Sequence, residues 1–337
     1  MQNINMSYQN LIDFSVHPSD IERFDNRWEG LKEYINQRKL DGVELLIGYD
    51  HPSDEIPREI VKSIHLPFWL TWLDVWRKGE KAVKSYFPEV KPEYLKFYCG
   101  GRNAAEMVQT QKEMWEYASL FHPSHAVIHA AHIELDHTFT RDYTYRNIEV
   151  CSCLAEMLNR TAKEFKHGEP PVSIAIENLW WPGLDLLFPA EIDDFAARLE
   201  FSNWNILLDT GHLMNTNPAL RCEDEAIDFV LDRISRLSKG VQDKIKSLHL
   251  NCSLSGEYQL QQIQNGFPEN WEKLTHPEKY LAARNHVLQI DQHLPFKTER
   301  VKDIITEIQP EIVVHELITK SLDEFTEKLE VQQNSLK

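Results

Sequence analysis

The chain has 337 residues, of which 42% are hydrophobic and 26% are charged, a composition typical of a globular protein with a large core. Asp and Glu outnumber Lys and Arg by 53 to 36, which gives a formal net charge of −17. This surplus argues against nucleic acid or an anionic membrane as a partner, because both attract positive charge. Five scattered cysteines without a C-x-x-C pair favour a reducing, cytoplasmic location over a disulfide framework. No apolar run approaches the length of a membrane span, and the N-terminus has no signal-peptide pattern.

Eight short apolar runs alternate with helical stretches along the chain. The predicted strands cover residues 11–16, 42–48, 61–68, 125–131, 172–178, 205–209, 245–251 and 311–317. Their nearly continuous apolar character is typical of parallel strands that are buried on both faces. Between them, apolar residues recur at helical spacing, as in 104–118 and in 223–239, where Gly240 is predicted to end the helix.

This alternation predicts either a (β/α)8 barrel or a doubly wound sheet. No G-x-G-x-x-G motif and no Walker loop follows a strand, which favours the barrel. We therefore predict an α/β fold, a (β/α)8 TIM barrel, as a single domain over residues 1–337. Because such a barrel needs roughly 250 residues, the remainder is assigned to loop insertions after strands 3 and 7, at about 69–101 and 252–286.

Metal-type ligands stand at the ends of six of the predicted strands. They are His65, His129, Glu177, Asp209, His249 and Glu316. In a TIM barrel these ends meet at the active site, and burying such groups costs several kcal/mol unless they are paired or bound to a metal. Mixed imidazole and carboxylate ligands favour zinc or manganese. The pairs Asp209-x-x-His212 and Asp291-x-His293 add further candidates, the second on a backbone expected to be extended.

The motifs H-L-P-F, H-A-A, I-E-N, L-D-T-G-H, H-L-N and D-Q-H resemble those of the xylose-isomerase-like TIM barrels, from about His65 to Glu316. This superfamily includes sugar phosphate isomerases/epimerases and an endonuclease IV branch, AP endonuclease family 2. Resemblance to the first implies one divalent ion on Glu177, Asp209, His249 and Glu316, with Glu177 and Glu316 also as the catalytic proton-transfer pair. Resemblance to the second implies up to three zinc ions, with His65, His129, His212, Asp291 and His293 as additional ligands.

The sequence favours a sugar or sugar-phosphate isomerase/epimerase that acts through a metal-stabilised enediolate. The negative charge and the acids of loop 49–55 argue against a DNA substrate. Candidate substrate-binding residues are Trp69, Trp180 and Trp181, which could stack on a sugar ring, with Asn178, Asn251 and His212. A multi-zinc phosphodiesterase and a non-catalytic sugar-binding barrel stay open as alternatives, as does a homo-oligomer.

Three other histidines are expected outside the site. Strand alternation turns His315 away from its neighbour Glu316, so it is predicted to be packed or hydrogen-bonded. His132 and His137 lie in the loop after the fourth strand and are predicted to face solvent.

Overall fold

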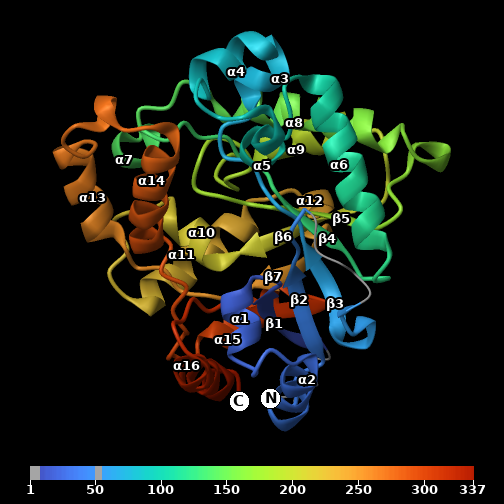
Figure 1. Ribbon diagram of the computed structural model, residues 1–337. Helices are drawn as coiled ribbons and strands as arrows, with labels where there is room; N and C mark the ends of the chain where they lie inside the picture. The colour runs from blue at the N-terminus through green and yellow to red at the C-terminus, as the bar shows by residue number, and fades with distance from the viewer. Residues whose placement is uncertain (1–7, 50–54) are drawn as a thin grey trace.

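Eight parallel strands close into a barrel in the computed structural model, which describes residues 8–49 and 55–337 (Figure 1). The strands are β1 Gln9–Ser15, β2 Gly42–Leu46, β3 Val61–His65, β4 Ala126–His129, β5 Ile174–Glu177, β6 Trp204–Asp209, β7 Ile245–His249 and β8 Ile312–His315. Each strand pairs with the next in chain order, and β8 pairs with β1. The predicted TIM barrel is confirmed, and every predicted strand overlaps an observed one.

Helices surround the barrel and cover its ends. They are α1 Pro18–Glu22, α2 Trp28–Gln37, α3 Leu73–Lys78, α4 Glu80–Tyr86, α5 Leu95–Cys99, α6 Ala104–Ser119, α7 His137–Thr140, α8 Asn147–Ala162, α9 Pro189–Arg198, α10 Thr210–Asn215, α11 Glu223–Ser235, α12 Lys239–Gln242, α13 Gly256–Asn265, α14 His276–Ile290, α15 Val301–Ile308 and α16 Leu322–Ser335. Within residues 8–49 and 55–337, every helix is too short or too polar to cross a lipid bilayer.

The predicted end of the 223–239 helix is wrong. Helix α11 stops at Ser235, and Gly240 lies inside the separate helix α12. The Ser238 hydroxyl accepts a hydrogen bond from the main-chain N–H of Val241 and so caps this new helix. Ser238, a favourable N-cap residue three positions before Val241, is the sequence signal for the start of this helix. The prediction relied instead on Gly240 as a helix end.

The two segments predicted as loop insertions contain helices. Residues 69–101 hold α3, α4 and α5, and the segment after β7 holds α13 and α14, which continues to Ile290, beyond the predicted end at 286. Helices α13 and α14 lie side by side with α7 in Figure 1. The chain therefore leaves β7, builds a helical hairpin and returns to the barrel at Asp291.

Strand register decides which side chains become neighbours inside the barrel. Asp13 on β1 is paired with Glu44 on β2, and Asp209 on β6 with His249 on β7. Side chains alternate between the two faces of a strand, so paired positions in neighbouring strands lie side by side on the same face. Ionisable residues on five or more strands are thereby brought to one end of the barrel.

Candidate metal centre

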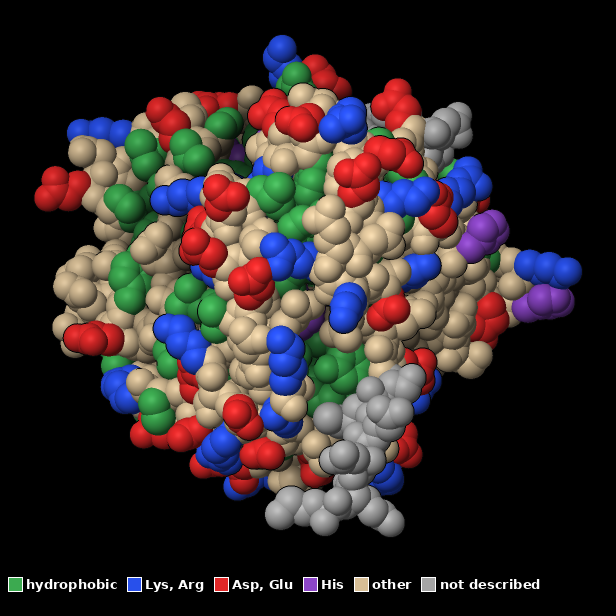
Figure 2. Space-filling model, turned by 90° about the horizontal axis from the view of Figure 1, so that it is seen from below, with side chains coloured by type: hydrophobic (Ala, Val, Ile, Leu, Met, Phe, Trp, Pro, Cys, Tyr) green, Lys and Arg blue, Asp and Glu red, His purple; other side chains and the backbone are tan. Residues whose placement is uncertain are grey.

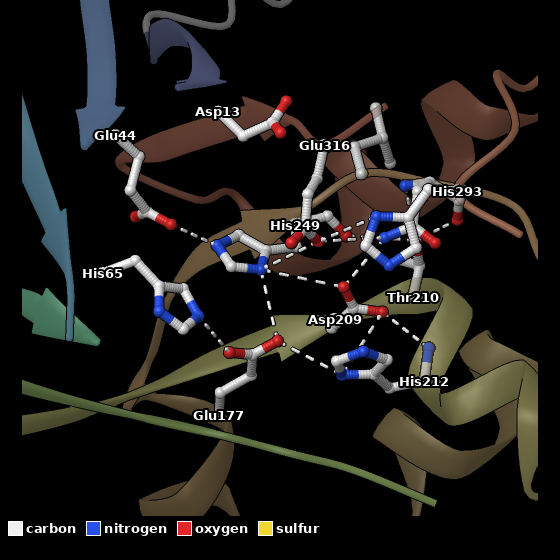
Figure 3. A network of polar contacts seen from close by, with 12 residues as sticks. Asp13, Glu44, His65, Glu177, Asp209, Thr210, His212, His249, His293 and Glu316 are labelled. Carbon is white, nitrogen blue, oxygen red and sulfur yellow. Dashed lines mark hydrogen bonds and ion pairs between the residues drawn. The ribbon is translucent and has the colours of Figure 1, made fainter. Parts of the chain in front are cut away.

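All nine predicted ligand side chains meet at the carboxyl end of the barrel, and Figure 3 labels all of them except His129 and Asp291. They form three groups in which one ligand atom from each residue lies within 4.8 Å of the others. The groups are His65, His129 and Glu177, called here the first group; Glu177, Asp209, His249 and Glu316, the central group; and His212, Asp291 and His293, the third group. Glu177 belongs to two of them.

Glu177 lies between the first and central groups and presents one oxygen to each. Its Oε2 atom is 3.3 Å from His65 Nε2 and 3.2 Å from His129 Nε2, and its Oε1 atom is 3.2 Å from His249 Nδ1. The side chain is fully buried, and Oε2 has no hydrogen-bond partner among the described residues. A buried carboxylate oxygen without a hydrogen bond is costly, and a metal ion is the kind of partner that would offset this cost.

His249 connects the central group to a residue that the sequence prediction missed, Glu44. On one side of the ring, Nδ1 lies 3.1 Å from Glu316 Oε2; on the other, Nε2 lies 2.6 Å from Glu44 Oε1. The Ser63 hydroxyl donates to Glu44 Oε2 at 2.8 Å. Burial alone would raise the pKa of Glu44, but His249 and His125 hold it well below its ordinary value. The sequence feature that could have identified Glu44 is an acidic residue inside the apolar run V-E-L-L-I-G.

The third group joins the barrel to the inserted hairpin. Asp291 Oδ2 lies 3.2 Å from His212 Nε2 and 2.7 Å from His293 Nε2. Asp291 directly follows α14, whereas His212 is on α10 after β6. The extended backbone predicted for the D-x-H segment is wrong, because His293 has a φ of 45° in the left-handed region. The turn still directs both side chains to one point.

Hydrogen bonds on the outer ring nitrogens leave Nε2 of two histidines available for a metal. His65 Nδ1 is 2.9 Å from the carbonyl oxygen of Leu66, and His212 Nδ1 is 2.9 Å from that of Asn178. Each Nδ1 must donate to its carbonyl, so when the ring is neutral Nε2 carries the lone pair, and it faces the carboxylates. Metal-binding histidines are oriented in this way, and the donor set of imidazoles and carboxylates fits zinc.

The charged groups of the site shift one another's pKa values. Burial would lower the pKa of His293, but Asp291 and Glu316 raise it to about 10. Burial and the nearby Glu316 raise the pKa of Asp13, which the sequence prediction also missed, to about 7. Burial and neighbouring acids likewise raise the pKa of Asp209. The raised pKa values of Asp13 and Asp209 favour protonated carboxyl groups there, and a cation bound beside them would displace these protons, whereas neighbouring histidines lower the pKa values of Glu177, Asp291 and Glu316.

Two predicted substrate-binding asparagines contact Asp209, a predicted metal ligand. The main-chain N–H of Asp209 donates to Asn178 Oδ1 at 2.8 Å, and Asn251 Nδ2 donates to Asp209 Oδ2 at 2.8 Å. A Cβ atom at Gly211 would lie 1.8 Å from Asn251 Oδ1, so the glycine of L-D-T-G-H permits this close approach. Contact of either asparagine with a substrate stays a prediction.

The predicted aromatic residues are packed inside the protein. Trp69 donates its indole N–H to Tyr49 Oη at 2.6 Å and to the carbonyl oxygen of Lys96 at 3.0 Å. Trp180 and Trp181 are buried, and the Trp180 ring lies 5.0 Å from that of His212. Stacking of these tryptophans on a sugar stays a prediction.

The other histidines gave a mixed outcome. His315 is buried, with Gln332 and Asn10 as hydrogen-bond partners, as predicted. The expectation that His132 faces solvent is wrong: it is buried, and the main-chain N–H groups of Trp72 and Leu73 donate to its Nδ1 at the start of α3. His137 is half-buried and lies 2.9 Å from Glu134. Residues 50–54 of the acidic loop lie outside the described residues.

A cavity of about 600 Å³ opens onto the three groups. Of the predicted substrate-binding residues, His212 lines it, together with the ligands His65, His129, Asp291, His293 and Glu316. On the face seen in Figure 2, Lys and Arg side chains are interspersed with Asp and Glu and form no basic stripe. A duplex-binding surface would concentrate positive charge.

The fold has close counterparts among solved structures. Endonuclease IV from Thermus thermophilus is 14% identical, with 97% of this chain and 98% of that chain covered and a TM-score of 0.50. A D-tagatose 3-epimerase-like protein is also 14% identical, with 97% of each chain covered and a TM-score of 0.51. No protein-family model and no curated protein matches the chain. At this level of identity the comparison shows the fold alone: the chain shares the TIM-barrel fold of these two proteins, which is the fold that the sequence motifs implied.

Proposed function

We propose that the protein is a metal-dependent hydrolase of phosphoesters that binds up to three divalent ions, zinc in the first place. The observation that carries this proposal is the position of Glu177, with one oxygen facing the first group and the other facing the central group. An isomerase site that binds one ion requires neither a carboxylate shared between two groups nor the side chains of the third group. Ions held here would help to ionise a water molecule near neutral pH and to neutralise the oxygens of a phosphoester.

The residues of the chain have separate tasks in this proposal. Glu177 would hold an ion of the first group and an ion of the central group, while His249 and Asp209 are fixed by Glu44 and Asn251. Even with the Glu44 carboxylate beside His249, the four carboxylates among the nine predicted ligands would not neutralise three divalent ions, and the remaining positive charge suits an anionic substrate. Glu316 is the member of the central group that lines the cavity, so it would face an incoming ester.

A sugar or sugar-phosphate isomerase/epimerase is the second candidate. It is favoured by the central group, which contains the Glu-Asp-His-Glu set expected for that chemistry, with Glu316 on the cavity wall. The difficulty lies with Glu177, whose side chain is fully buried and faces imidazoles. A proton-transfer group must reach a carbon of the substrate.

The test uses protein stripped of metal and reloaded with zinc or manganese. We expect two or three ions per chain by elemental analysis and metal-dependent hydrolysis of p-nitrophenyl phosphate or bis(p-nitrophenyl) phosphate. Asp291→Asn should reduce the rate. Metal-dependent incorporation of deuterium into ketoses in D2O, without hydrolysis, would establish the isomerase instead. Ligand binding without turnover of either kind would leave the non-catalytic barrel.

Two further properties belong to the same proposal. All five cysteines are free and four are buried, which fits a reducing, cytoplasmic location. Cleavage of an abasic-site duplex would make nucleic acid the substrate and contradict the proposed small-molecule partner. Light scattering would determine whether the chain forms a homo-oligomer.

A further inference from the structure

The cavity above the metal groups has the dimensions of a small-molecule site. Its volume of about 600 Å³ falls within the range of roughly 300–1,000 Å³ found for pockets that enclose small organic ligands. Metal ligands and Phe68, which stacks on His129, form one side, and the ends of β1 and β8 with α1 and its flanking residues form the other; Arg284 of α14 also lines the cavity. The polarity of the second side determines which alcohol group of a phosphoester fits the cavity.

The polar groups of that second side are occupied with one another. Arg23 Nη1 donates to Thr319 Oγ1 at 3.2 Å, and Nη2 donates to the carbonyl oxygen of Thr319 at 2.7 Å. The same guanidinium lies 3.4 Å from Asp20. His17 Nδ1 lies 2.8 Å from Ser19 Oγ. Groups paired in this way are poor partners for sugar hydroxyls, since each new hydrogen bond would replace an existing one.

Large apolar side chains in the same cavity are exposed. Phe68 is 39% exposed and Ile318 is 41% exposed, and both line the cavity close to ligands. The Phe68 ring stacks on that of His129, with centroids 4.0 Å apart and an interplanar angle of 21°. Phe14 and Leu317 extend the apolar wall inward. Exposed apolar surface inside a cavity contributes to binding when an apolar ligand covers it.

We infer that the substrate is a phosphoester whose alcohol is a compact apolar group, aryl or branched alkyl, that packs against Phe68 and Ile318. This inference rests on the proposed function, which puts the phosphoryl group at the metal groups. In the reaction, the oxygen of one water forms a new P–O bond and the ester P–O bond breaks. The alcohol leaves with one of the protons of that water. An acyclic polyol would leave these apolar side chains uncovered.

The experiment compares benzyl phosphate with glycerol 1-phosphate in the zinc-loaded protein. Both are primary alkyl esters, so the leaving groups are chemically matched. Calorimetry with benzylphosphonate and 2,3-dihydroxypropylphosphonate measures binding without turnover. We expect the benzyl compounds to be preferred at least about 10-fold in kcat/KM and in affinity, as the burial of several apolar groups implies.

Ile318→Ser should lower the affinity for benzylphosphonate about 3- to 10-fold and leave that for the dihydroxypropyl compound unchanged. Ile263→Ser is the matched control, because Ile263 is 36% exposed on α13 and does not line the cavity. Equal affinities for the two phosphonates, or equal effects of the two variants, would overturn the inference while the hydrolase remains. Absence of hydrolysis of every ester, including the chromogenic ones, would overturn the proposed function itself.

Discussion

Glu44 Oε1 lies 2.6 Å from His249 Nε2, on the side of the imidazole opposite to the carboxylates that face Nδ1 (Figure 3). Because the Glu44 carboxylate accepts from Nε2–H, the lone pair of the neutral ring is on Nδ1. Glu44 therefore sets both the orientation and the tautomer of His249, and with them the readiness of the central group for a metal ion.

Replacing Glu44 should weaken the central site without removing a ligand. Glu44→Gln is expected to lower zinc affinity there by about 10- to 100-fold, measured by competition with a chromophoric chelator. Glu33→Gln is the control, because Glu33 is exposed on α2. Unchanged affinity in a folded Glu44→Gln protein would remove Glu44 from the positioning role.

The shared position of Glu177 predicts unequal metal losses. Glu177→Gln should release or strongly weaken two ions, because its two oxygens face different groups. His293→Gln should affect one ion, because His293 belongs to the third group alone. Elemental analysis after gel filtration measures both, with the exposed His122→Asn as control. Equal losses in the two variants would contradict a bridging Glu177.

Substitution of Gly211 by alanine tests the close packing around Asp209, and the same substitution at Gly240 is the control. Gly211→Ala would force Asn251 away from Asp209, and we expect weaker zinc binding and a destabilisation of about 1–3 kcal/mol. Gly240→Ala meets nothing within 4 Å and lies inside α12, so it should stabilise the protein by up to about 1 kcal/mol. Chemical denaturation checks both; a harmless Gly211→Ala would contradict the assigned contact.

Between pH 6.5 and about pH 10, the stability of the metal-free protein should fall as the pH rises. The pKa of His293 is raised from 6.5 to about 10 in the folded chain, and the pKa values of His212 and His249 are also raised. A histidine with a raised pKa stabilises the fold fully below its unfolded pKa, and this contribution is lost as the pH rises through the folded value. The loss amounts to about 1.4 kcal/mol per pH unit for each proton involved.

Zinc should reverse this trend, because a metal ion binds the deprotonated ligands. The difference in Tm between zinc-loaded and chelator-treated protein is therefore expected to widen between pH 6.5 and pH 10. Thermal unfolding at several pH values in this range, followed by circular dichroism, measures it. A constant difference would show that the site histidines do not titrate with folding.

The barrel and the meeting of the nine candidate ligands at one end of it could be predicted from sequence, because the eight strands were nearly continuous apolar runs and six of them ended in a metal-type residue. Glu44 and Asp13 could not, since they lie inside such runs, where an isolated acid gives no hint of its partner. The backbone at His293 also escaped prediction, because D-x-H spacing fits several conformations. The role of the tryptophans depends on packing between distant segments, which local sequence does not encode.

The third group has one more consequence, for the hairpin of α13 and α14. His212 and Asp291 are 79 residues apart in sequence, and the chain between them contains the whole hairpin. An ion held by both would act as a reversible crosslink that fastens the end of the hairpin to the barrel. Metal loading and the anchoring of this hairpin would then be a single equilibrium, and zinc supply would govern how readily a protease cuts the hairpin.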